Sequence, residues 1–79
     1  MNKQTLEAAI AAITALKGPN FNVALLLVSG HRLAGKVFLP VGNQGFVRID
    51  VTRIEGANLR DGPVPSWVNL EAIQVVALD

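Results

Sequence analysis

Two glycines, Gly30 and Gly35, lie between apolar stretches in the segment SGHRLAGKV. With Lys36 they match part of a phosphate-binding P-loop, whose lysine is followed by a serine or threonine that holds magnesium. Val37 occupies that position, and the residues after it alternate in polarity like a strand, whereas a P-loop needs a helix there. We therefore interpret Gly30 as a turn residue and Gly35 as a glycine that lets a strand bend sharply.

Residues on both sides of this turn indicate two antiparallel strands. Residues 23–28 form a continuous apolar run, which is typical of a strand buried on both faces. After the turn at 29–32, residues 33–41 alternate with the period of two that a strand requires. Pro40 lacks an N–H donor, so it predicts a strand edge or a strand end.

The C-terminal half continues the β pattern. A second turn at 42–45 precedes an alternating strand at 47–52, and the phase changes at Arg53 and Ile54, which predicts a bulge or bend. Residues 55–65 are rich in Gly and Pro and predict a loop. Two further strands are expected, at 67–70 and 74–78.

Residues 5–17 predict an amphipathic helix. Its apolar stripe, which we expect to pack on the rest of the domain, comprises Leu6, Ala9, Ile10, Ile13 and Leu16. Thr5 is expected to cap the start of the helix, and Lys17, Gly18 and Pro19 to end it. One helix followed by short strands and turns predicts a single mainly β domain over residues 1–79, with a small closed or nearly closed barrel.

The balance of apolar and charged residues is unusual for a small domain. The apolar fraction is 51% and the charged fraction 16%, whereas about 25% charged is typical. A small chain has a large surface relative to its volume, so we expect copies of the chain or a partner to cover part of it. The net charge of +1 is weak for a nucleic-acid binder, although an oligomer would concentrate it.

Several classes of function lack the residues that they need. The chain has no cysteine and one histidine, and its carboxylates show no paired spacing for acid–base catalysis. We therefore expect no enzyme activity, no metal site and no cofactor. No secretory signal is apparent, and the longest apolar run is too short to span a bilayer, so we expect a cytoplasmic protein without a membrane segment.

Two segments resemble a known family. Residues 27–37, LVSGHRLAGKV, resemble the first Sm motif and especially its bacterial Hfq form, in the pattern Leu-Val-x-Gly-x-x-Leu-x-Gly-x-(Val/Ile). Residues 68–76, VNLEAIQVV, resemble the second motif, in which Ala-Ile and a closing Val pair recur. The resemblance implies a helix at about 5–17 on a strongly bent five-stranded Sm-like (SH3-like) small barrel at about 21–78. It also implies a homo-oligomeric ring, pentameric to heptameric, joined through the fourth and fifth strands.

The resemblance further implies single-stranded RNA as the ligand, with bases held by two loops. The first loop corresponds to Asn43, Gln44 and Phe46, and the second to Asn69, Leu70 and Glu71. Three more candidate nucleic-acid contacts are His31, Arg32 and Lys36. The second loop departs from the family, because Leu70-Glu71 replaces a basic Lys-His pair and a carboxylate repels phosphate.

Other interpretations of these residues remain open. His31 also fits a solvated turn residue, and Arg32, Lys36 and Arg48 fit the solvated faces of strands. Phe46 fits the core or an interface better than a base-stacking site. Trp67 fits an interface anchor, because it opens a predicted interface strand. The alternative function is an Sm-like oligomeric module with a structural or protein-interaction role and no nucleic-acid binding.

Overall fold

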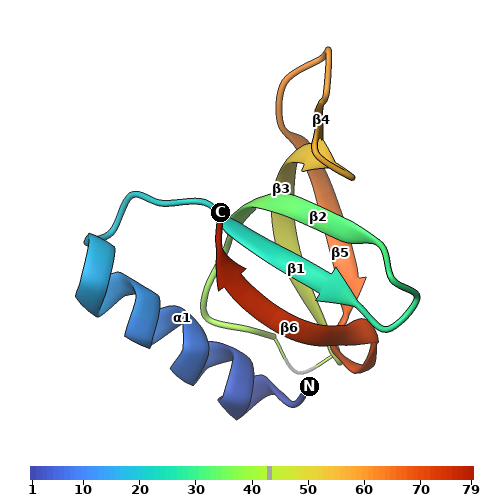
Figure 1. Cartoon of the computed structure of the whole chain (residues 1–79). Helices are drawn as coiled ribbons and strands as arrows, with labels where there is room; N and C mark the ends of the chain where they lie inside the picture. The colour runs from blue at the N-terminus through green and yellow to red at the C-terminus, as the bar shows by residue number, and fades with distance from the viewer. Residues whose placement is uncertain (43) are drawn as a thin grey trace.

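A computed structural model describes residues 1–42 and 44–79 of the chain. The predicted site residue Asn43 lies outside the described residues. The fold is mainly β with one N-terminal helix (Figure 1). Its elements are α1 (Lys3–Lys17), β1 (Val23–Leu27), β2 (Arg32–Val37), β3 (Phe46–Ile54), β4 (Ala57–Asn58), β5 (Val64–Asn69), the short 3-10 helix η1 (Leu70–Ala72) and β6 (Ile73–Leu78).

Helix α1 begins two residues before the predicted start at residue 5. Thr5 is not its cap, because Asn2 takes that position and its side-chain oxygen accepts a hydrogen bond from the Thr5 N–H at 2.7 Å. The predicted end is confirmed: Lys17 lies in the last turn, and the N–H of Gly18 donates to the Thr14 carbonyl at 2.8 Å. Gly18 has a φ of 80°, a value that glycine adopts readily.

The apolar stripe of α1 packs on the sheet over its first turns only. Leu6 and Ile10 are buried in the core and Ile13 is partly buried against it. The expectation for Leu16 is wrong, since this residue is 83% exposed. The side chain of Glu7 accepts a hydrogen bond from the Val41 N–H at 3.2 Å, which ties the helix to the segment between β2 and β3.

The strands form one antiparallel sheet in the order β4-β3-β2-β1-β6, with β5 also paired to β3. The sheet has six strands rather than five, because Ala57 and Asn58 in the predicted loop pair with Arg53 and Ile54 to form β4. The sheet formed by the described residues is not closed, since β5 pairs only with β3 and β6 only with β1, so the closed form of the expected barrel is not observed. Strands β5 and β6 therefore each have one unpaired edge.

The turn and bend that the two glycines predict are confirmed. Gly30 has a φ of 92° in the turn between β1 and β2, and β2 continues through Lys36 to Val37, so no P-loop helix follows. At Gly35 the backbone of β3 approaches closely, and an added Cβ would lie 2.1 Å from the Asp50 carbonyl oxygen. The register between β2 and β3 shifts next to Gly35, which is the predicted irregularity near Arg53.

The core is formed by one face of the bent sheet together with Leu6 and Ile10 of α1. Alternate residues of β3 point into it, and helix, strands and η1 all contribute to the buried cluster, which comprises Leu6, Ile10, Val23, Leu25, Val41, Val47, Ile49, Val51, Val68, Leu70 and Ile73. The prediction that residues 23–28 are buried on both faces is wrong for their second half. Leu26 is 37% exposed and Val28 65% exposed.

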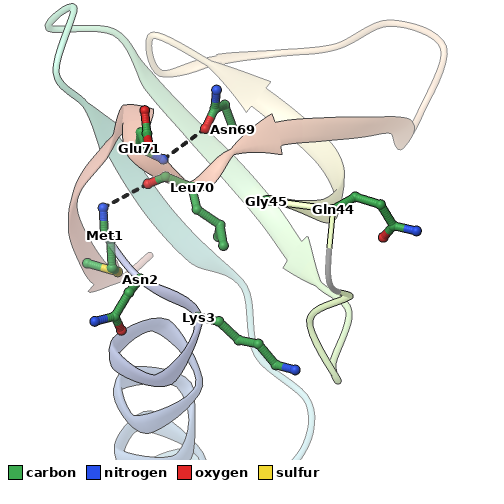
Figure 2. Close-up of a pocket in the computed structure, with 8 residues that line it drawn as sticks. All are labelled: Met1, Asn2, Lys3, Gln44, Gly45, Asn69, Leu70 and Glu71. Atoms are coloured by element: carbon green, nitrogen blue, oxygen red, sulfur yellow. Dashed lines mark hydrogen bonds between the residues drawn. The ribbon is translucent and has the colours of Figure 1, made fainter.

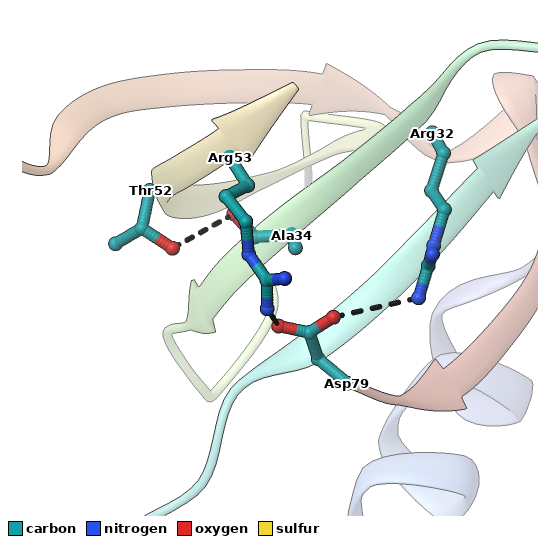
Figure 3. A network of polar contacts seen from close by, with 5 residues as sticks. All are labelled: Arg32, Ala34, Thr52, Arg53 and Asp79. Carbon is teal, nitrogen blue, oxygen red and sulfur yellow. Dashed lines mark hydrogen bonds and ion pairs between the residues drawn. The ribbon is translucent and has the colours of Figure 1, made fainter. Parts of the chain in front are cut away.

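An ion-pair cluster covers part of the opposite, outer face of the sheet (Figure 3). Asp79 pairs with Arg53 and, at 3.4 Å, with Arg32. The Asp79 side chain is only 7% exposed. Beneath the cluster, Ala34 is buried, and its carbonyl accepts a hydrogen bond from the Thr52 hydroxyl at 3.3 Å. Arg32, predicted to be a solvated strand residue, is thus part of a structural ion pair.

Candidate functional site

Three segments that are far apart in the sequence line one open pocket, which we call the loop site (Figure 2). They are residues 1–3, residues 44–45 before β3, and residues 69–71 between β5 and β6. The pocket has a volume of about 640 Å³. The structure therefore brings together residues from both of the loops that the sequence predicted as binding loops.

Main-chain pairing fixes the two loops beside each other. Phe46, the first residue of β3, pairs with Asn69, the last residue of β5. One residue further on, the Leu70 N–H donates to the Gly45 carbonyl at 2.9 Å. Leu70 is also buried in the core, so the main chain at the bottom of the loop site is held in position by core packing.

Asn69 has a structural role as well as a place in the pocket. Its side-chain oxygen accepts a hydrogen bond from the Glu71 N–H at 2.9 Å and so caps η1. This bond fixes the orientation of the side chain and leaves its NH₂ group as a donor. An amide held in this way can donate to a base edge or a phosphate oxygen.

The loop site carries groups of both charge signs. Lys3 lines it on the α1 side, and the Met1 nitrogen lies 2.9 Å from the Leu70 carbonyl, to which it donates. Glu71, an exposed residue of η1, also lines the pocket and adds a carboxylate. The side chains of Gln44 and Asn69 add uncharged donors and acceptors. The pocket therefore favours a polar ligand without a strong preference for an anion.

The other predicted site residues in the described part of the chain do not line this pocket. Arg32 pairs with Asp79 on the outer face of the sheet, and Lys36 lies on the same face farther along β2. Phe46 is 38% exposed, so of its two expected places, the core or an interface, the core is wrong. His31 lies in the turn between β1 and β2 and its side chain is 69% exposed, as a solvated turn residue should be.

His31 makes a contact that the sequence did not indicate. Its Nδ1 atom lies 2.8 Å from a carboxylate oxygen of Glu55, in the turn between β3 and β4, and the Arg32 N–H donates to the same oxygen at 3.1 Å. The hydrogen bond with His31, followed by the one from Arg32, lowers the pKa of Glu55 below its ordinary value of 4.5. The contact joins two turns and lies outside the loop site.

Sequence reasoning also missed a cation–aromatic cluster on the outer face of the sheet. The Arg48 guanidinium lies 4.6 Å from the centroid of the Phe38 ring, and the Lys36 ammonium lies 5.9 Å from it. The alternation of residues 33–41 could have placed Phe38 beside Lys36, and that of β3 could have placed Arg48 on the outer face. No local pattern predicts the register between β2 and β3 that brings the ring and the guanidinium together.

Within residues 1–42 and 44–79, no group of three or more His, Cys, Asp or Glu side chains could hold a metal ion. The same residues contain no helix with the length and apolar character needed to cross a membrane. Comparison of the chain with protein-family models, curated proteins and solved structures gives no match.

Proposed function

We propose that the chain is an Sm-like protein that assembles into a ring and binds single-stranded RNA at the loop site. The observation that carries the proposal is the meeting of two loops: the Phe46–Asn69 pair and the Leu70–Gly45 hydrogen bond bring together the segments that the resemblance assigns to base binding. The open pocket that they form carries polar side chains that can hydrogen-bond to a nucleobase.

The unpaired edges of β5 and β6 support the ring. They follow each other in the chain through η1, and a strand edge without a partner offers free N–H and C=O groups to another chain. Pairing β5 of one copy with β6 of the next is a head-to-tail contact, which closes into a ring when the rotation per subunit allows. The resemblance gives an expected ring size of five to seven subunits. We also propose, on the same resemblance, that each subunit has the Sm-like small-barrel fold.

Titration of the protein with short U-rich and A-rich RNA oligonucleotides, at low and at moderate salt, tests RNA binding. We expect fluorescence anisotropy of a labelled oligonucleotide to rise with protein concentration and the affinity to fall as salt is added, because phosphate contacts release counterions. Absence of salt-sensitive binding by the assembled protein would refute the RNA part of the proposal. Light scattering gives the number of subunits in the same samples.

A second candidate is the same oligomer used as a protein-binding module. The Glu71 carboxylate in the loop site favours it, since a cation there would serve RNA better. Capture of partners from a lysate treated with nuclease distinguishes the two functions. Partners that persist after nuclease treatment support the protein module, and partners lost with the RNA argue against it.

A further inference from the structure

The outer face of the sheet next to the loop site collects aromatic side chains. Phe46 and Arg48 point outward from β3, because Val47 and Ile49 alternate with them and are buried in the core. On β5 the residue opposite Phe46 is Asn69, and the residue opposite Arg48 is Trp67. Trp67 is 61% exposed, so its indole is a large open surface on this face.

Phe38 belongs to the same face. Its N–H donates to the Arg48 carbonyl at 3.0 Å, directly after β2 ends. Its ring lies 4.6 Å from the Arg48 guanidinium and 5.9 Å from the Lys36 ammonium, and both cations extend from the outer side of their strands. We call this surface, made of Lys36, Phe38, Phe46, Arg48 and Trp67, the aromatic–basic face. It holds three of the four aromatic residues of the chain.

Arg48 is held in place at the centre of the aromatic–basic face. Besides the Phe38 ring, it contacts Asp50, whose carboxylate oxygen accepts from both Nε and a terminal nitrogen at 3.3 Å. The Arg48 side chain is still 45% exposed. A guanidinium fixed in this way presents donors to an incoming anion and loses little side-chain freedom on binding.

We propose that the aromatic–basic face is a second binding surface, on which a single-stranded nucleic acid stacks a base on Trp67 and places phosphates against Arg48 and Lys36. Stacking on an exposed ring beside a cation needs no particular base sequence. Each nucleotide has a flat base that can stack on the Trp67 indole and a phosphate that can bind the Arg48 guanidinium. The two side chains are one strand spacing apart, so one nucleic acid strand can contact both. Main-chain pairing of β5 with another copy uses the edge of the strand, so it leaves this face open.

The surface adjoins the loop site, because Asn69 belongs to both the Phe46–Asn69 pair and the pocket wall. A strand bound at the loop site can therefore continue across Phe46 to Trp67. The choice of ligand rests on the proposed function, but the two sites give separate signals in an experiment. Trp67 is the sole tryptophan and the chain has no tyrosine, so its emission reports on the aromatic–basic face alone.

The test is a titration of the intact protein with a uridine oligonucleotide of about ten residues, followed at once by Trp67 emission and by anisotropy of a label on the oligonucleotide. We expect saturable quenching that weakens with salt. Inorganic polyphosphate should displace the oligonucleotide without quenching, since it has no base to stack. Binding seen by anisotropy without a change in emission would overturn the second surface and leave the loop site standing, whereas no anisotropy change would refute the proposed function itself.

Variants separate the contributions. Arg48→Gln should weaken the affinity measured by emission by about ten-fold, whereas Arg60→Gln, in the loop between β4 and β5, makes the same charge change away from the face and should leave it unchanged. Trp67→Ala should lose about ten-fold in anisotropy affinity and Trp67→Phe should retain most of it, because the ring is what stacks. Circular dichroism establishes that each variant is folded. Equal losses from Arg48→Gln and Arg60→Gln would contradict a localised site.

Two other occupants would give different results. An acidic peptide such as oligoglutamate would quench nothing by base stacking, so a blue shift of Trp67 emission with oligoglutamate and none with RNA would overturn the proposal in favour of a protein partner. A blue shift that grows with protein concentration in the absence of any ligand would show that another copy of the chain covers Trp67. That result would also overturn the proposal.

Discussion

At the residue scale, Asn2 shows how one side chain sets the start of α1. The periodic apolar stripe that begins at Leu6 led to Thr5 as the expected cap. In the structure Asn2 accepts the hydrogen bond and Thr5 donates it. The first apolar residue of a stripe therefore predicts that a helix exists but does not locate its first turn, because the cap depends on the direction from which the chain enters.

Asn2→Ala should lower the free energy of unfolding by about 1 kcal/mol, the typical value of a lost N-cap. Thr5→Ala removes a hydroxyl that the cap does not use and should cost less than about 0.5 kcal/mol. Urea denaturation followed by circular dichroism measures both variants. A larger loss from Thr5→Ala than from Asn2→Ala would mean that the helix begins at residue 5 after all.

Glu71 is the residue of the loop site that most opposes the proposed ligand. A unit charge at about 4 Å from a phosphate in water costs about 1 kcal/mol, so Glu71→Gln should tighten oligonucleotide binding by about five-fold. Asp61→Asn, in the exposed loop between β4 and β5, makes the same charge change far from the site (Figure 1). Fluorescence anisotropy at low salt measures the affinity of both variants for the oligonucleotide. Equal gains in affinity would mean that only the net charge of the protein matters.

Glu55 predicts a pH dependence of stability. Its pKa is lowered in the folded state by the hydrogen bonds with His31 and the Arg32 N–H. A carboxyl group with a lowered pKa stabilises the fold above its unfolded pKa, and this contribution disappears as the pH falls through the folded value. The Tm of the wild type should therefore exceed that of Glu55→Gln near neutral pH, and the gap should close as the pH falls below 4.5. A gap that widens in acid would contradict the assignment; Asp61→Asn serves as the control.

At the scale of elements, the sequence predicts best where one physical cause acts locally. The helix, the Gly30 turn and the alternating strands β2 and β3 follow from periodicity and from backbone freedom at glycine. The sequence did not predict β4, because a strand of two residues leaves no period to detect. The start of β5 at Val64 was also missed, since Pro65 argues against a central strand and is tolerated because β5 lies at the edge of the sheet.

The pairing of β2 with β3 requires a residue without a side chain at position 35. A methyl group there would lie 2.1 Å from the Asp50 carbonyl oxygen, which is main chain and cannot turn aside. Gly35→Ala should therefore cost about 3 kcal/mol, as overpacking of a fixed site does. At Gly42 an added Cβ meets only the end of the flexible Gln44 side chain, so Gly42→Ala should cost less than about 0.5 kcal/mol. Similar urea midpoints for the two variants would contradict the close approach.

At the scale of the whole molecule, the candidate site was only partly predictable. Gln44, Phe46 and Asn69 were chosen because they lie in two loops, and the pairing of β3 with β5 brings those loops together. His31, Arg32 and Lys36 were chosen for their residue type. They lie elsewhere because a local sequence pattern does not predict which strand ends lie next to each other in the sheet. That the sheet is open could not be predicted either, because it depends on whether β5 pairs with a strand that is distant in the sequence.

The open sheet and the apolar composition make one prediction about assembly. Val75 on β6 pairs with Leu26 and is 44% exposed, so the unpaired edge of β6 carries apolar side chains where a stable monomer would carry charge. A ring would cover such an edge with β5 of the next copy, and it would account for a surface with only 16% charged residues in the chain. Light scattering should therefore give a mass of five to seven times 8.4 kDa.

A lysine at the edge of β6 tests whether that edge carries the assembly. Val75→Lys should shift the mass toward that of one chain, because a charged side chain at an edge opposes strand pairing between copies. Leu16→Lys makes a similar change at an apolar residue of α1 that is 83% exposed and belongs to neither strand edge, so the mass should not change. Circular dichroism verifies that both variants are folded. An oligomer that survives Val75→Lys but dissociates with Leu16→Lys would mean that the helix, and not the sheet edge, joins the subunits.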